Sequence, residues 1–261
     1  MIKKSISVPI APVHNSSSFR SEMVTQCLMW DLVEILSLLD DWCEIRTSDK
    51  YNGWIHSFYL SELEFDETQS LVVNSRFLPI FCSDSSSSNI LYLLSFGTKV
   101  PLVSNASGFV KVPIGISSHG YIEAPQNIYS KNRNSISNLA ESLIGVPYLW
   151  GGKSSFGLDC SGFVQLVFMV TGVNLPRDSS LQYEIDQLEQ IELDKSLPGD
   201  LIFFLDKQIV NHVGIIFDKY RFIHCSGSVK LESLVKPDKH FNLALGQMKY
   251  VVKSVSRFLD I

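Results

Sequence analysis

The run Leu158-Asp159-Cys160-Ser161-Gly162-Phe163 places a cysteine among polar neighbours at the start of an apolar segment that continues to Val170. The segment is apolar on nearly every side, which predicts a buried helix over residues 160–170. Unpaired backbone N–H groups in the first turn of a helix stabilise an anion such as a thiolate. Cys160 is therefore our candidate nucleophile.

Two histidines follow this cysteine, each bordered by strand-like residues. His212 lies in Asn211-His212-Val213-Gly214, and His224 follows Phe222-Ile223. As a base, His212 could take the thiol proton and later protonate the leaving amine, and as an imidazolium it would lower the pKa of Cys160. His224 could hydrogen-bond the far ring nitrogen of His212 and hold its tautomer. This order of residues predicts a cysteine hydrolase.

Length and composition indicate a folded protein of two or three domains. The chain has 261 residues, of which 45% are hydrophobic and 19% charged, so it can bury ordinary cores. Its net charge of −5 and the lack of a basic run argue against nucleic acid and anionic membranes as partners.

The cysteines and the hydropathy profile bear on cofactors and location. The five cysteines form no C-x-x-C pair, which argues against a metal site or a disulfide framework and favours reduced thiols. The apolar stretch at residues 5–13 is too short and too proline-rich for a secretory signal, and no segment is long enough to span a membrane. We expect a cytoplasmic protein without a cofactor.

The pattern of apolar and turn residues along the chain changes near residues 125–127. Before this point, short β-rich runs alternate with turn residues, and after it the apolar residues take on a helical period. The second part predicts helices packed on an antiparallel sheet, an α+β architecture. The expected helices cover residues 137–144 and 160–170, and the expected strands cover 201–205, 213–217, 221–225 and 248–252.

The first part resembles a tandem of bacterial SH3-like domains. Residues 42–46 and 53–55 read as a hairpin, and the pattern partly recurs over 108–122. We therefore expect small all-β SH3-like barrels at 1–66 and 67–126. The second is divergent, because the serine-rich run 83–89 interrupts it as a loop.

Residues 136–257 resemble the NlpC family of papain-like cysteine peptidases. Six motifs in this part of the chain occur in the order that is typical of the family. They are Pro147-Tyr148-Leu149-Trp150-Gly151-Gly152, Leu158-Asp159-Cys160-Ser161-Gly162-Phe163, Leu175-Pro176-Arg177-Asp178-Ser179, Pro198-Gly199-Asp200-Leu201-Ile202-Phe203-Phe204, His212-Val213-Gly214-Ile215 and Phe222-Ile223-His224-Cys225-Ser226-Gly227. The resemblance implies an NlpC-type peptidase domain over 127–261. With the SH3-like domains in front, the chain resembles the γ-D-glutamyl-L-diamino acid endopeptidases.

The resemblance also implies an activity. Such enzymes hydrolyse the γ-D-glutamyl-diamino acid bond, typically to diaminopimelate, in murein peptides that carry a free N-terminal L-alanine. We therefore expect a monomeric enzyme of peptidoglycan recycling whose partner is a murein peptide of the L-Ala-γ-D-Glu-diaminopimelate type. Three alternatives remain open: a hydrolase that remodels the wall itself, an inactive SH3-type wall-binding protein, and an acyltransferase of the wider papain-like superfamily.

Matched position by position, the resemblance implies roles for individual residues. Cys160 matches the nucleophile, His212 the base, His224 the third polar residue and Tyr148 a hydroxyl that helps the Cys160 N–H to hold the oxyanion. Asp159 matches a carboxylate that binds the substrate ammonium. The other implied substrate contacts are Ser161, Trp150, Asp178, Ser179, Glu22 and Tyr51.

Two positions depart from the family pattern. Cys225 stands where the family commonly has alanine, which adds a second thiol near the site. Trp30-Asp31 replaces a glycine-acid turn in the first SH3-like domain, which puts the shape of that loop in question.

Overall fold

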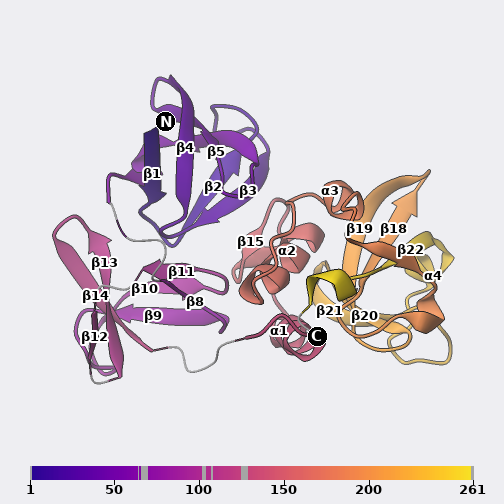
Figure 1. The fold of residues 1–261 in the computed structure, drawn as a ribbon. Helices are drawn as coiled ribbons and strands as arrows, with labels where there is room; N and C mark the ends of the chain where they lie inside the picture. The colour runs from indigo at the N-terminus through magenta and orange to yellow at the C-terminus, as the bar shows by residue number, and fades with distance from the viewer. Residues whose placement is uncertain are drawn as a thin grey trace. The chain divides into compact units, whose positions relative to one another are not determined.

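The chain folds into two compact units, Met1–Ile128 and Tyr129–Ile261 (Figure 1). The structure is a computed structural model, and it describes residues 2–63, 65, 70–101, 104–106, 108–124 and 129–259. The expected boundaries near residues 66–67 and 125–127 lie at or within stretches outside the described residues. The division of the chain into three domains therefore stays a prediction.

The first unit is all-β, and its N-terminal part is one antiparallel sheet. In the described residues the strand order is β3-β2-β6-β5-β4-β1-β7, and the predicted hairpin is β5 paired with β6. The buried face is built from aliphatic residues of alternate strand positions, such as Val13, Ile45 and Ile55. The elements are β1 Ile2–Ile6, β2 Ile10–His14, β3 Met23–Leu28, β4 Leu32–Leu39, β5 Trp42–Arg46, β6 Asn52–His56, the 3₁₀ turn Ser57–Tyr59 and β7 Leu60–Ser61.

The rest of the first unit forms a second group of antiparallel strands. Within the described part of this region, the order is β10-β9-β14-β13-β12 in one sheet, with β11 paired to β8 in another. The predicted recurrence over 108–122 corresponds to the hairpin of β13 and β14. The strands are β8 Ser70–Val72, β9 Phe77–Phe81, β10 Ile90–Ser95, β11 Lys99–Pro101, β12 Ser104–Ala106, β13 Phe109–Gly115 and β14 Ser118–Glu123. That these two β-regions are SH3-like barrels stays a prediction.

Trp30 explains the unusual turn of the first β-region. Its φ of 66° lies in the left-handed region that favours glycine. The side chain is only 3% exposed because it packs with Val73, Ile80 and Leu94 in the core of the second β-region. Its indole Nε1–H donates to the Pro113 carbonyl at 2.8 Å. The tryptophan therefore holds the two β-regions together while it occupies a glycine-like backbone conformation.

Trp30→Gly is expected to destabilise the first unit by roughly 2–4 kcal/mol. Loss of a buried tryptophan costs roughly 3–5 kcal/mol, and relief of the left-handed backbone returns only about 1 kcal/mol. Asp40→Gly is the matched control, because Asp40 has a φ of 49° but is exposed. Urea unfolding, with hydrogen exchange to assign the transition of the first unit, measures the effect. Equal stability of the two variants would contradict this account.

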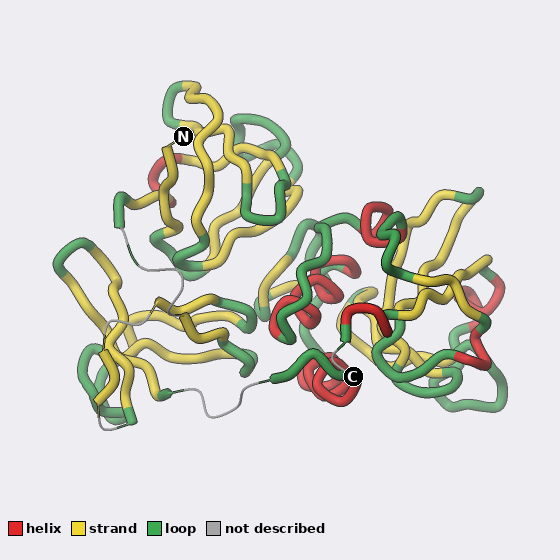
Figure 2. The backbone as a smooth tube through the Cα atoms, in the orientation of Figure 1, coloured by secondary structure: helices red, strands yellow, loops and turns green. Residues whose placement is uncertain are grey.

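The second unit is α+β, as predicted, with helices packed on an antiparallel sheet (Figure 2). Among the described residues the strand order is β17-β22-β18-β19-β20-β21. The strands are β15 Lys153–Ser154 and β16 Gly157–Leu158 (a separate hairpin), β17 Glu189–Ile191, β18 Leu201–Asp206, β19 Ile209–Ile216, β20 Arg221–Ser226, β21 Ser228–Ser233 and β22 Lys249–Ser254. The helices are α1 Arg133–Ser142, α2 Cys160–Val170, α3 Ser179–Tyr183 and α4 Leu243–Gln247, with 3₁₀ turns at Leu193–Lys195 and Ser256–Phe258.

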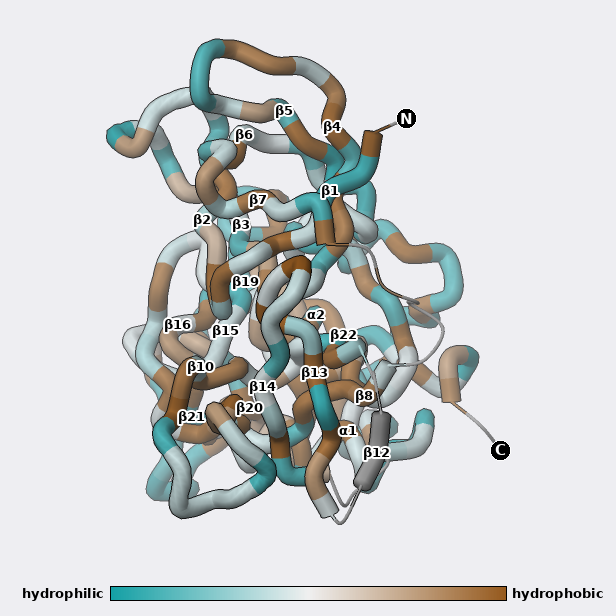
Figure 3. Tube along the Cα trace, turned by 90° about the vertical axis from the view of Figure 1, so that its left-hand side faces the viewer, coloured by the Kyte–Doolittle hydropathy of each residue, from teal (hydrophilic) through white to brown (hydrophobic). Residues whose placement is uncertain are grey.

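Helix α2 is the element that positions the site. It packs against α1, β19 and β20, and its side chains from Phe163 to Phe168 are buried. Figure 3 shows hydrophobic and hydrophilic stretches alternating along the chain, as expected where polar turns join apolar strands and helices. In the described part of the chain, no helix combines the length and the hydropathy that crossing a bilayer requires.

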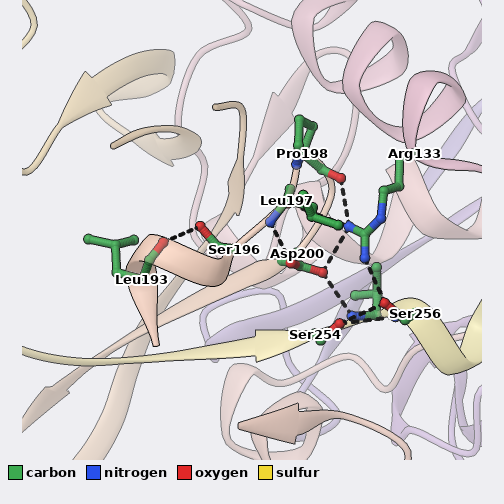
Figure 4. A network of polar contacts seen from close by, with 9 residues as sticks. Arg133, Leu193, Ser196, Leu197, Pro198, Asp200, Ser254 and Ser256 are labelled. Atoms are coloured by element: carbon green, nitrogen blue, oxygen red, sulfur yellow. Dashed lines mark hydrogen bonds and ion pairs between the residues drawn. The ribbon is translucent and has the colours of Figure 1, made fainter. Parts of the chain in front are cut away.

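Asp200, in the Pro198-Gly199-Asp200 motif, joins three parts of the second unit (Figure 4). Its carboxylate is 1% exposed and accepts from Arg133 Nη1 of α1 at 2.9 Å. It also accepts from the backbone N–H groups of Leu197 at 2.8 Å and Val255 at 3.0 Å. Arg133 in turn donates to the Pro198 carbonyl at 2.8 Å. The motif thus serves to connect α1, the start of β18 and the C-terminal segment.

Asp200→Asn is expected to lower the free energy of unfolding of the second unit by about 1.5–3 kcal/mol. Asparagine keeps one acceptor oxygen and replaces the other with an NH₂ donor. Arg133 therefore loses its charged partner, and at least one of the N–H groups bonded to Asp200 loses its acceptor. Asp194→Asn, at an exposed carboxylate in a nearby turn, is the control and should stay within about 0.5 kcal/mol of wild type. Urea denaturation measures the stability of both variants. If Asp200→Asn lost as little stability as Asp194→Asn, the connecting role of Asp200 would be refuted.

Candidate active site

Cys160 is the first residue of α2, and the hairpin of β15 and β16 leads into it. Asp159 is the N-cap residue, and its Oδ1 accepts from the Gly162 N–H at 2.7 Å. Glycine is needed at both 162 and 152. A Cβ at Gly162 would lie 2.3 Å from the Gly152 carbonyl oxygen, and a Cβ at Gly152 would lie 2.5 Å from the Gly157 carbonyl oxygen. The hairpin therefore lies directly against the first turn of the helix.

The two histidines are hydrogen-bonded neighbours on adjacent strands. His212 Nε2 on β19 lies 2.7 Å from His224 Nδ1 on β20, with the rings nearly perpendicular. His224 is fully buried, and its register partner is Gly214. A Cβ at Gly214 would lie 3.0 Å from the His224 Cβ, so glycine gives the imidazole its space.

The sulfur of Cys160 lies beside the His212 strand. Backbone N–H groups of Ser161 and of Val213, the residue after His212, hydrogen-bond the sulfur. His212 Nε2 is bonded to His224, which leaves Nδ1 as the ring nitrogen that does not take part in this bond. The structure thus pairs the two histidines and places the Cys160 sulfur beside the residue that follows His212. The catalytic roles of the three residues stay a prediction.

The electrostatics of this group differ from the expectation. Burial raises the pKa of Cys160 to about 11, with the Asp159 carboxylate adding to the effect and the backbone N–H groups opposing it. Burial also lowers the pKa of His212 to about 3, with His224 adding to that effect. The predicted lowering of the thiol pKa is therefore wrong, because desolvation outweighs the helix terminus. At neutral pH the resting pair is a thiol and a neutral imidazole.

Tyr148 lies on the strand-like segment that borders Cys160. This segment pairs with Leu158 on one side, and the Tyr148 N–H donates to the Gly227 carbonyl at 2.9 Å on the other. Burial raises the pKa of Tyr148 to about 12, and the nearby Cys160 and Asp159 add to it. The phenol therefore stays a hydroxyl donor at physiological pH. Trp150, two residues on, is 62% exposed.

Arg177 is a site residue whose role the sequence reasoning missed. Its side chain is 2% exposed, and its Nη1 donates to Asp159 Oδ1 and to Ser161 Oγ, each at 2.9 Å, while Nη2 pairs with Asp159 Oδ2. Gln182 of α3 donates to the Ser161 carbonyl at 3.1 Å. Asp159 and Ser161 are thus held in a buried network. Its place beside Asp178 in the Leu175–Ser179 motif was the sequence feature that could have identified Arg177 as a site residue.

The other residues that were predicted to contact the substrate are distributed over both units. Asp178 is the N-cap residue of α3, Ser179 opens that helix, and both are half-buried. Glu22 is exposed and accepts from Asn15 Nδ2 at 3.4 Å, and the Tyr51 N–H donates to Thr47 Oγ1 at 3.1 Å. Glu22 and Tyr51 belong to the first unit. That they join the site of the second unit stays a prediction.

Glu232 of β21 also reaches the histidines and was not predicted. Its Oε2 lies 2.9 Å from His224 Nε2 and accepts from Asn242 Nδ2 at 2.6 Å. The turn residues Ser226-Gly227-Ser228 after His224 could have indicated a hairpin that returns this carboxylate to the site. Among the residues that the structure describes, no cluster of three or more His, Cys, Asp or Glu is arranged to hold a metal ion.

Residues 145–245 match the model of the NlpC/P60 family, and they contain the cysteine and both histidines. These residues form an NlpC/P60 domain. The chain is 27% identical over 214 residues to a gamma-D-glutamyl-L-lysine dipeptidyl-peptidase of Bacillus subtilis, covering 77% of this chain and 71% of that protein. It is 24% identical over 242 residues to dipeptidyl-peptidase 6 of Lysinibacillus sphaericus, covering 83% and 85%.

A solved structure shows the same fold. The crystal structure of an NlpC/P60 family protein from Bacillus cereus superposes with a TM-score of 0.80 at 21% identity, covering 96% of this chain and 98% of that one. The NlpC/P60 domain and the named peptidase relatives establish the class of the enzyme. The chain is a cysteine peptidase.

Proposed function

We propose that this NlpC/P60 enzyme hydrolyses the γ-D-glutamyl-diamino acid bond of murein peptides that carry a free N-terminal L-alanine. The observation that carries the proposal is the hydrogen-bonded His212–His224 pair beside Cys160 at the start of α2. The name of the Bacillus subtilis relative, whose match extends across both units, supports the γ-D-glutamyl specificity. The role of the enzyme in peptidoglycan recycling, and its cytoplasmic location, belong to the same proposal.

In the proposed mechanism, proton transfer accompanies attack, because the resting thiol and imidazole are neutral. His212 Nδ1 takes the proton as Cys160 Sγ bonds to the γ-glutamyl carbonyl carbon. The Cys160 N–H and the Tyr148 hydroxyl donate to the resulting oxyanion. The tetrahedral intermediate then expels the amine of the diamino acid, which takes the proton from His212.

The remaining thioester is hydrolysed by the same groups. Water attacks the thioester carbonyl while His212 Nδ1 takes one of its protons. The second intermediate expels the Cys160 sulfur, which recovers the proton from His212. The γ-carboxyl of the D-glutamate is released, and the enzyme returns to the thiol and neutral imidazole.

Recognition of the alanine ammonium would need more than Asp159. The buried Arg177 already neutralises that carboxylate, so Asp159 alone offers an ammonium little net charge. We assign the missing negative charge to Glu22, and a further contact with the substrate to Tyr51. Ser161, Asp178 and Ser179 are assigned to the glutamate and Trp150 to a wall of the substrate cleft.

Peptide digestion followed by mass spectrometry tests this function. L-Ala-γ-D-Glu-meso-diaminopimelate is incubated beside its N-acetylated form and beside the same peptide with L-lysine as the diamino acid. Cleavage of the free-amine peptides alone is expected, and cleavage of both forms at equal rates would reject recognition of the amine. Turnover of intact sacculi at a rate comparable to that of the tripeptide would reject the recycling role.

A further inference from the structure

We infer that Glu232 is a positioning residue, one that fixes the proton arrangement of His224 and His212 so that His212 Nδ1 is the basic nitrogen. The inference deepens the proposed function, because it rests on His212 acting as the base for Cys160. Glu232 lies on β21, which pairs with β20, the strand of His224. It acts through His224 and has no role in touching the substrate.

Three donors surround the Glu232 carboxylate. Oε2 accepts from His224 Nε2 at 2.9 Å and from Asn242 Nδ2 at 2.6 Å, and Oε1 lies 2.9 Å from Lys230 Nζ. Burial alone would raise the pKa of Glu232, but the bonds from His224, Lys230 and Asn242 lower it to about 2. The group is therefore an ionised carboxylate, which can only accept hydrogen bonds.

When both rings are neutral, an acceptor at His224 Nε2 fixes the positions of the other protons in the pair. His224 Nε2 must carry hydrogen to donate to Glu232, so in the neutral ring Nδ1 is an acceptor. His212 Nε2 must then carry hydrogen to donate across the 2.7 Å contact to His224 Nδ1. His212 Nδ1 is left with a free lone pair.

Two histidines alone could adopt the reverse arrangement. In that case His224 Nδ1–H would donate to His212 Nε2, and the proton of the neutral His212 ring would lie on Nδ1. A protonated Nδ1 cannot accept the thiol proton, so this tautomer is inactive. The Glu232 carboxylate disfavours this inactive tautomer, because the reverse arrangement would leave two acceptors, His224 Nε2 and Glu232 Oε2, facing each other.

The charge of Glu232 acts in the same direction as its geometry. The Glu232 carboxylate raises the pKa of His212, against the larger effect of burial. It therefore strengthens a weak base and stabilises the imidazolium that forms as Cys160 attacks. The glutamate side chain is 14% exposed, so solvent screens this interaction only in part.

Asn242 holds the carboxylate in place from a second element. Its Oδ1 caps α4 by accepting from the Leu245 N–H at 3.0 Å, while its Nδ2 donates to Glu232. Lys230, whose side chain is 39% exposed, satisfies the other carboxylate oxygen. The oxygen that faces the fully buried His224 is thus held by the hairpin and by the helix cap together.

Glu232→Gln tests the inference, because glutamine keeps the shape but loses the charge and can donate through its amide. We expect kcat on L-Ala-γ-D-Glu-diamino acid peptides to fall by about 10–100-fold, part of the roughly 10²–10⁴ that a general base contributes, with KM within about twofold. Glu232→Asp retains the charge and is expected to recover part of kcat. Asp218→Asn is the matched control, since it removes a half-exposed carboxylate at the turn between β19 and β20.

Nitrogen-15 NMR of the imidazoles provides a readout that needs no substrate. The wild type should show a protonated Nε2 and an unprotonated Nδ1 at both histidines, and Glu232→Gln should show mixed tautomers. Wild-type kcat and unchanged nitrogen shifts in Glu232→Gln would overturn the inference, and a rise in KM alone would reassign Glu232 to substrate binding. If the wild type does not cleave the peptides but the tautomer depends on Glu232, the proposed substrate fails and the positioning role stands.

Discussion

Cys160→Ala is expected to lower kcat on the proposed murein peptides by roughly 10⁵-fold or more, because removal of a nucleophile abolishes the covalent route. The fall in kcat is measured by quenching digests at timed intervals and quantifying the products by mass spectrometry. Alanine fits the first turn of a helix well, so the folded state should be retained. Residual cleavage within tenfold of wild type would exclude Cys160 as the nucleophile.

Cys225→Ala is the matched control for this experiment. Cys225 is a second thiol close enough for the charge of Cys160 to affect it, but it is fully buried and donates to the Leu158 carbonyl at 3.0 Å. Burial raises the pKa of Cys225 to about 12, which makes it an inert thiol. We expect the variant to lose about 1 kcal/mol of stability and to retain activity within a few-fold. A loss as large as that of Cys160→Ala would show that the thiols act together.

Arg177→Met is expected to lower the free energy of unfolding of the second unit by roughly 3–5 kcal/mol, because it leaves the Asp159 carboxylate without its buried partner. Asp159 also caps α2, so the position of Cys160 should loosen and kcat should fall. Urea denaturation and peptide turnover measure the two effects. The double variant Arg177→Met with Asp159→Asn should recover stability, since the unpaired charge is gone and Oδ1 still caps the helix.

Arg221→Met is the comparison for Arg177. Arg221 pairs with Asp218 at the surface, where both side chains are at least one-third exposed, and such pairs contribute about 0–1 kcal/mol. A loss for Arg177→Met no larger than that for Arg221→Met would contradict the structural role of the buried pair.

Helices and strands were predictable where their signal is local. The predicted helix over 160–170 has the bounds of α2, because an apolar segment with a capping aspartate is complete within a short window. α1 begins at Arg133, before the predicted residue 137, because Asn132 caps it by accepting from the Ser135 N–H. β17 and β21 were missed, since few of their residues are buried and their hydrophobic pattern is weak.

The sequence by itself determined the class of the enzyme, the α+β architecture of the second unit and the choice of Cys160, His212 and His224 as candidate catalytic residues. These features lie in short motifs whose order along the chain is sufficient to recognise them. Only the tertiary structure decided what surrounds them: the buried Arg177 under Asp159, the Glu232 carboxylate behind His224 and the packing of Trp30 in a neighbouring core. It also reversed the expected shift of the thiol pKa. Desolvation and contacts between distant segments arise from packing, which no local pattern of residues encodes.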